Sequence, residues 1–146
     1  MQRWVAIAVL VSAGAATAQT PGFWLTGRAP TATSGSASGL SQDGLVAVGG
    51  SSNGTIAPGF SWTRSGGRYD FGLEPGMLAG TVAAATDALG QTIVGSMTDI
   101  QHPARAYRRV GNAPLENLGV LPNELRSYAQ GVSGNGSLIV AHCAHT

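Results

Sequence analysis

Short apolar runs recur along the chain at a fixed spacing, and each follows a polar turn that ends in glycine. The turn glycines lie 46 residues apart and are Gly44, Gly90 and Gly136. The apolar runs behind them are residues 45–48, 92–94 and 138–140. A stretch of small residues, rich in Ala and Gly, precedes each turn. A fixed period of this length predicts a repeat protein, in which each repeat is one small packing unit.

Each repeat is predicted to hold four short strands. In the first repeat they are residues 36–41, 45–51, 58–64 and 68–73. Asp43-Gly44 has the composition of a two-residue hairpin turn between the first two strands, because glycine readily takes a positive φ. Phe60 and Trp62 alternate with polar positions on the third strand, which is typical of a strand with one buried face.

The second strand of each repeat is apolar at consecutive positions, which predicts burial on both faces between two neighbouring sheets. We therefore expect an all-β fold of repeated four-stranded antiparallel units of about 46 residues, arranged like an incomplete β-propeller. A β-solenoid, with strands stacked along an axis, is the alternative. The predicted core is Leu40, Val46, Val48, Phe60, Trp62, Phe71, Ile93, Val94, Tyr107, Leu118, Val132, Leu138 and Val140.

The repeats divide the chain into segments. These are a signal peptide at 1–18, a linker or partial repeat at 19–33, repeats at 34–80 and 81–126, and a truncated third repeat at 127–146. Propellers close with about 4–8 blades. We therefore expect either a piece of a longer protein or an assembly of several chains. Open sheet faces and strand edges would favour self-association.

The N-terminal residues have the pattern of a secretory signal peptide. Arg3 provides the positive charge, residues 4–16 are almost entirely apolar, and residues 16–18 form a small-x-small cleavage site. A transmembrane anchor is the alternative, but a span needs about 20 apolar residues, and this stretch is shorter. The mature chain is expected to begin at Gln19 and to be secreted, periplasmic or on the cell surface.

Charge and cysteine content exclude several classes of partner and fold. All eight basic residues are Arg, and the loss of Arg3 with the signal leaves seven against seven acidic residues. A neutral chain has no long-range field that attracts phosphate, so neither nucleic acid nor an anionic membrane is the expected partner. No segment after the signal is apolar enough to span a membrane. Cys143 is the single cysteine, which excludes a scaffold held by internal disulfides.

The first two repeats share a series of motifs. The first repeat has small residues at 37–49, then Phe60-Ser61-Trp62, then Phe-Gly-Leu-Glu-Pro at 71–75. The second has the matching segments at 83–95, 102–107 and 117–122. This series resembles the HAF repeats of bacterial secreted and surface proteins, named for a His-Ala-Phe signature, over most of residues 34–142. The resemblance implies a secreted or surface protein with no defined enzymatic activity and no catalytic residues to transfer.

The repeats depart from that family pattern at three places. The His-Ala-Phe signature is not intact in any copy. Arg109 stands where the alignment with Trp62 would place a tryptophan. Leu89 replaces the Asp or Asn of the turn.

Two groups of residues are candidate metal ligands. The first is the C-terminal group His142, Cys143 and His145. On a strand only Cys143 and His145 share a face, whereas a closed zinc site needs four ligands. The second group lies near the repeat turns and is Asp43, Asp87 and Asn135. Because Ca²⁺ takes about 6–8 oxygen ligands, we expect these residues to stabilise turns, and we assign no metal or cofactor.

A basic and aromatic group on one segment is a candidate for contact with phosphate or an acidic glycan. Its members are Arg105, Tyr107, Arg108 and Arg109. The alternative, which the neutral total charge favours, is a solvated strand face with the tyrosine ring in the core.

The leading hypothesis is a secreted or surface-exposed repeat protein that acts as a non-enzymatic structural or binding scaffold for an extracellular protein or glycan. The alternative is a polysaccharide-active hydrolase or lectin-like module that uses Asp70, Glu74 or Glu116. A paired-carboxylate site needs two groups about 5–10 Å apart. Nothing in the sequence aligns two of these across a cleft, so no catalytic residue is assigned.

Overall fold

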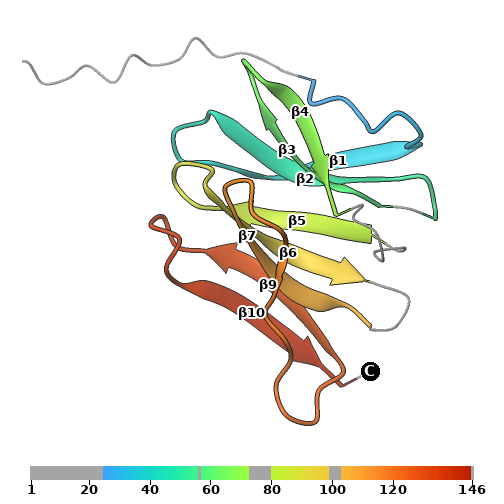
Figure 1. Cartoon of the computed structure of the whole chain (residues 1–146), viewed down its shortest axis with the longest axis vertical. Helices are drawn as coiled ribbons and strands as arrows, with labels where there is room; N and C mark the ends of the chain where they lie inside the picture. The colour runs from blue at the N-terminus through green and yellow to red at the C-terminus, as the bar shows by residue number, and fades with distance from the viewer. Residues whose placement is uncertain (1–24, 56, 73–79, 99–102, 146) are drawn as a thin grey trace, which may run out of the picture.

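The computed structural model describes residues 25–55, 57–72, 80–98 and 103–145, and within these ranges the regular elements are all β-strands (Figure 1). The expected signal peptide, part of the 19–33 segment and Glu74 lie outside the described residues. In chain order the strands are β1 Ser34–Leu40, β2 Val46–Ser52, β3 Gly59–Thr63, β4 Gly67–Phe71, β5 Gly80–Thr86, β6 Thr92–Thr98, β7 Arg105–Val110, β8 Glu116–Asn117, β9 Arg126–Val132 and β10 Ile139–Ala144.

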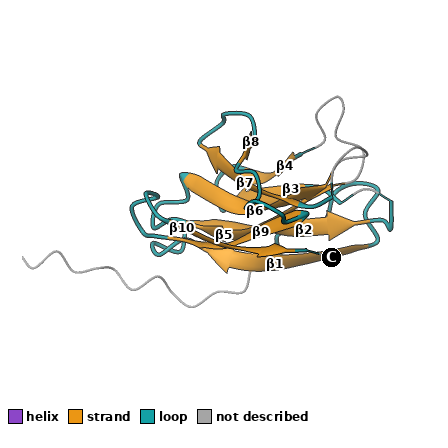
Figure 2. Ribbon diagram, turned by 90° about the horizontal axis from the view of Figure 1, so that it is seen from below, coloured by secondary structure: helices purple, strands orange, loops and turns teal. Residues whose placement is uncertain are grey.

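The strands form three antiparallel sheets, one for each expected repeat. Their strand orders are β1-β2-β3-β4, β5-β6-β7-β8 and β10-β9. The expected all-β fold of four-stranded antiparallel units is therefore confirmed for the first two repeats. The sheets follow one another along the molecule, from β1–β4 to β9–β10 (Figure 1). Viewed from below, β4 and β8 lie on the same side of the stack (Figure 2).

The repeated turn glycines take the positive φ that the sequence predicts. Their φ angles are 71° at Gly44, 73° at Gly90 and 73° at Gly136. The connection is longer than the expected two residues, because β1 ends at Leu40 and β2 begins at Val46. The amide of Gly44 bonds to the carbonyl of Ser41 at 2.9 Å, so residues 41–44 form a four-residue turn that ends at the glycine. Loops of this length are commonly built around such a turn.

A β-bulge recurs in the first strand of each sheet, at the same position of the repeat. The register shifts between Ala37 and Gly39 in β1 and between Ala83 and Ala85 in β5, and the β9–β10 pair shifts at the matching place. Gly49 lies opposite the first bulge, where a Cβ would come 2.0 Å from the carbonyl oxygen of Ser36. This close approach of the two strands requires glycine there.

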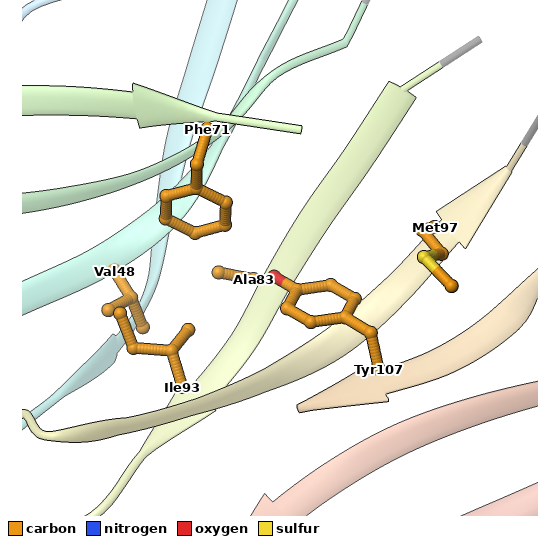
Figure 3. Packing of buried hydrophobic residues seen from close by; sticks show 6 residues of the cluster. All are labelled: Val48, Phe71, Ala83, Ile93, Met97 and Tyr107. Carbon is orange, nitrogen blue, oxygen red and sulfur yellow. The ribbon is translucent and has the colours of Figure 1, made fainter. Parts of the chain in front are cut away.

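The sheets pack through the second strand of one unit and the first strand of the next: β2 against β5, and β6 against β9. The core between the first two sheets is Val48, Phe71, Ala83, Ile93, Met97 and Tyr107 (Figure 3). The Tyr107 ring meets the Phe71 ring edge to face, with centroids 6.3 Å apart. The second core, which is smaller, is Val94, Ala106 and Ala129.

A buried hydroxyl joins neighbouring sheets at each of the two seams. The Thr81 hydroxyl on β5 accepts a hydrogen bond from the Gly59 amide at 2.7 Å and donates to the Phe71 carbonyl at 3.0 Å. Ser127, 46 residues later on β9, accepts from the Ala106 amide at 2.8 Å and donates to the Gly119 carbonyl. Each hydroxyl thus satisfies two backbone groups of the preceding sheet, which would otherwise be buried without partners.

Part of the predicted core was wrong. Val48, Phe60, Phe71, Ile93, Val94 and Tyr107 are buried as expected, but four predicted core residues are exposed: Leu40, Leu118, Leu138 and Val140. Val46, Trp62 and Val132 are half-buried. Val140 belongs to the third sheet and Leu138 lies just before its strand β10, and no described residue covers the outer face of this sheet. Leu40 lies at the end of an exposed strand, and Leu118 lies just beyond the short β8.

Candidate functional site

The candidate turn ligands Asp43, Asp87 and Asn135 hold backbone amides in place. In the first turn the Ser41 hydroxyl donates to the Asp43 carboxylate at 2.6 Å and accepts from the Val46 amide, while the carboxylate accepts from the Leu45 amide. These bonds, that from Ser41 first, hold the pKa of Asp43 below its ordinary value. Ser133 and Asn135 repeat the arrangement in the third turn.

The second turn reaches the same result with one side chain. The buried Asp87 carboxylate accepts hydrogen bonds from the amides of Leu89 at 3.2 Å, Gln91 at 2.8 Å and Thr92 at 2.9 Å. Asp87 occupies the repeat position of Ser41 and Ser133, not that of Asp43. The single Asp87 carboxylate therefore accepts the kind of amide hydrogen bonds that a Ser and an Asp share in the first turn. This explains why a leucine, Leu89, can stand where the other turns have Asp or Asn.

The C-terminal histidines each have a separate neighbour. The His142 ring stacks on Tyr128 with centroids 5.0 Å apart, and its Nδ1 lies 3.4 Å from the Gln130 amide nitrogen. The His145 Nδ1 lies 2.6 Å from the carbonyl oxygen of Asn123. Cys143 is a half-buried free thiol. Within the described ranges no three His, Cys, Asp or Glu side chains are grouped as metal ligands.

The predicted basic and aromatic group does not form one surface. Tyr107 is fully buried in the core, as the alternative interpretation expected, and this burial raises the pKa of its hydroxyl. Arg105 donates to backbone carbonyls, including that of Leu125. Arg108 pairs with Glu116 at 2.6 Å. Arg109 is 5% exposed, so the expectation that it lies on a solvated face was wrong.

The candidate carboxylates Asp70 and Glu116 lie on different strands, and each forms an ion pair with an arginine of its own sheet. Asp70 on β4 accepts from Arg68 at 2.7 Å. Arg68 also lies 3.8 Å from the centroid of the Phe60 ring and donates to Ser51 at 2.7 Å. Glu116 on β8 pairs with Arg108. The structure therefore does not present these two carboxylates as a pair.

An open pocket, here called the seam pocket, lies where the first sheet meets the second. It is lined by Tyr69, Asp70, Phe71 and Gly72 of the first unit and by Arg109, Asn112 and Ala113 of the second. β4 supplies the aromatic rings, and β7 with the loop after it supplies the guanidinium and the amide. The Asp70 side chain points to the opposite face of β4, toward Arg68, because side chains alternate along a strand. Of the predicted site residues, the pocket thus includes Arg109 of the basic group, while the carboxylate of Asp70 faces away from it.

The Arg109 guanidinium lies against two aromatic rings of β4. Its central carbon lies 5.0 Å from the centroid of the Tyr69 ring and 5.1 Å from that of Phe71. Its NH2 nitrogen lies 3.5 Å from the Asn112 side-chain oxygen, at the limit of a hydrogen bond. Among the described residues no carboxylate forms an ion pair with it. Contact with ring faces offsets part of the cost of burying the charge.

The sequence carries one signal for this pocket, which is the arginine at position 109. A cation in place of the repeat's tryptophan breaks the pattern of the buried strand, and such local conflicts often mark functional sites. Tyr69 carried no signal of its own, because an aromatic residue on an alternating strand is usually a core residue. It is instead 55% exposed.

Comparison with known proteins adds no family to this description. No family model, no curated protein and no solved structure matches the chain. Separately, the described part of the chain contains no helix with the length and apolar character needed to cross a membrane.

The role of Asp87 can be tested by converting the second turn to the form of the other two. Asp87→Ser alone should lower the free energy of unfolding by about 1–3 kcal/mol, because the Leu89 and Gln91 amides lose their acceptor. The double variant Asp87→Ser, Leu89→Asp rebuilds the Ser-x-Asp pair and should recover most of that loss. Urea unfolding followed by circular dichroism measures both. A double variant no more stable than the single one would contradict this account.

Proposed function

We propose that this chain is an exported repeat protein that acts as a non-enzymatic binding scaffold in the medium, the periplasm or on the cell surface. The observation that carries the proposal is the seam pocket. Its lining comes from two repeats and combines exposed aromatic surface with polar and charged groups, which is typical of a recognition site. Export is supported by the signal-like N-terminus, and a surface role by the resemblance to HAF repeats.

We propose further that the units are stacked like propeller blades. The separate sheet of each repeat supports this arrangement, because a solenoid would continue one sheet from repeat to repeat. The packing of β2 on β5 and of β6 on β9 also supports it. The exposed Leu138 and Val140 occupy positions where the other sheets are covered, which supports self-association through this face.

The alternative function, a polysaccharide-active hydrolase, is not supported by the arrangement of the described carboxylates Asp70 and Glu116. Such an enzyme needs two carboxylates held about 5–10 Å apart on either side of a sugar. Glu116 is not among the lining residues of the seam pocket, and the Asp70 carboxylate pairs with Arg68 on the other face of β4. A lectin-like role uses the same seam pocket and is compatible with the binding scaffold.

The scaffold function predicts binding without cleavage. The purified mature chain, mixed with a panel of insoluble polysaccharides and cell-wall preparations, should sediment with at least one of them. A reducing-end assay on the same mixtures should give the value of a protein-free incubation. Release of new reducing ends would contradict the non-enzymatic assignment, and failure to sediment with any material would argue against the scaffold role.

Export predicts a defined mature N-terminus. The full-length chain with a C-terminal tag is produced in a Gram-negative host. It should appear outside the cytoplasm, and its measured mass should equal that of a tagged chain that begins at Gln19. The matched control Ala18→Asp places a charge at the cleavage site, where small residues are needed, and should retain the signal. A cytoplasmic product that keeps residues 1–18 would overturn the assignment.

A further inference from the structure

We propose that the seam pocket binds a carboxylate-bearing sugar, a uronic acid residue of an acidic glycan. This inference rests on the proposed binding function and names the ligand class of the same site. It depends on three features of the pocket: a buried cation, an exposed tyrosine ring, and a polar side chain, Asn112, beside the cation.

The cation of the pocket favours an anionic group. Arg109 is 5% exposed, and its recorded polar partner is the Asn112 oxygen at 3.5 Å. A guanidinium has five N–H donors in a planar fork, and a carboxylate can accept two of them in parallel. Such a pair is strongest where water is excluded, as around a buried Arg. The ligand carboxylate would therefore supply the partner that the described residues do not.

The acidic residue among the lining residues, Asp70, does not cancel this preference, because its side chain points to the other face of β4. The Asp70 carboxylate is already paired with Arg68 at 2.7 Å, and the two side chains are 24% and 10% exposed. The three groups Arg68, Asp70 and Arg109 together carry one formal positive charge. The local charge of the pocket therefore attracts an anion although the mature chain is formally neutral.

The other lining groups favour a sugar over a peptide carboxylate. Tyr69 is 55% exposed beside the buried cation, so its ring offers an apolar surface to the C–H face of a pyranose. The Asn112 amide can both donate hydrogen bonds to sugar hydroxyls and accept them from these groups. A peptide carboxylate would use Arg109 and leave these groups without a matched partner.

The pocket belongs to one seam, not to every repeat. The positions of the second repeat that match Tyr69, Asp70 and Phe71 are Glu116, Asn117 and Leu118. None of these three residues is aromatic, and the carboxylate stands at the position of Tyr69 and not at that of Asp70. A buried arginine is also less favourable for stacking than the tryptophan of the first repeat. The replacement is therefore best explained by ligand binding.

Titration of the ¹⁵N-labelled mature chain by NMR tests the proposal. The probe is trigalacturonate, and the matched control ligand is its methyl ester, which has the same rings without the charge. Trigalacturonate should shift the amide signals of residues 69–72 and 111–113, more weakly as salt is raised, and the ester should shift them much less. Equal shifts from both ligands, or no shifts at these amides, would overturn the proposal.

Variants separate the pocket from general charge effects. Arg109→Gln should weaken binding by about tenfold or more, as expected for loss of a charged hydrogen-bonded pair. Tyr69→Ala should weaken binding severalfold, and its exposed position leaves the fold intact if Arg109→Gln does not fold. Arg108→Gln, the matched control, removes the neighbouring charge that pairs with Glu116 and should leave binding unchanged. A loss as large in Arg108→Gln as in Arg109→Gln would contradict the proposal.

The same titration distinguishes a sugar carboxylate from a peptide carboxylate. Together with the sedimentation assay, it also separates failure of the ligand class from failure of the scaffold function. An acetylated glutamate-containing peptide that shifts the same amides at equal or lower concentration would overturn the sugar assignment in favour of a peptide carboxylate. If trigalacturonate fails while the chain still sediments with a polysaccharide, the ligand class is wrong and the scaffold function stands. If both fail, neither stands.

Discussion

The structure depends on one packing contact, in which the second strand of one sheet packs against the first strand of the next sheet. Val48 and Val94 occupy the same position in successive repeats, and both are fully buried by this contact. Val140 is the third member of the series and is 60% exposed, because no described residue lies over it. The small residues of the covering strands, such as Ala83 and Ala129, allow the sheets to approach closely, and burial of apolar surface stabilises the stack.

The same contact positions the polar features of the molecule. Thr81 and Ser127 bond across the seams because each sits at the start of a covering strand. The seam pocket exists for a related reason: stacking brings β7, with Arg109, beside the aromatic side chains of β4. Since the pocket draws on two repeats, neither unit would hold it alone. A ligand bound there would therefore stabilise the first seam, as does any ligand that binds only the folded state.

Much of the fold could be predicted from the sequence because it is a local property repeated at a fixed period. The turn glycines, the four strands of a unit and the apolar second strand are all visible in one repeat. Burial was predicted less well, because it depends on what covers a residue. Leu138 has the pattern of Val46 but is exposed. The hydrogen bonds of Asp87 and the burial of Arg109 could not be predicted from the repeat. At both positions the residue type differs from that of the matching position in the first repeat.

The central claim, that contacts between sheets stabilise the chain, is tested most directly by comparing the three matched valines. Each is changed to alanine, and the free energy of unfolding is measured by urea denaturation in dilute solution. Val48→Ala and Val94→Ala remove buried methyl groups from the two seams and should each cost about 2 kcal/mol. Val140→Ala should change the value by no more than about 0.5 kcal/mol. Equal losses at all three positions would contradict the account, because stability would then not follow the coverage of one sheet by the next.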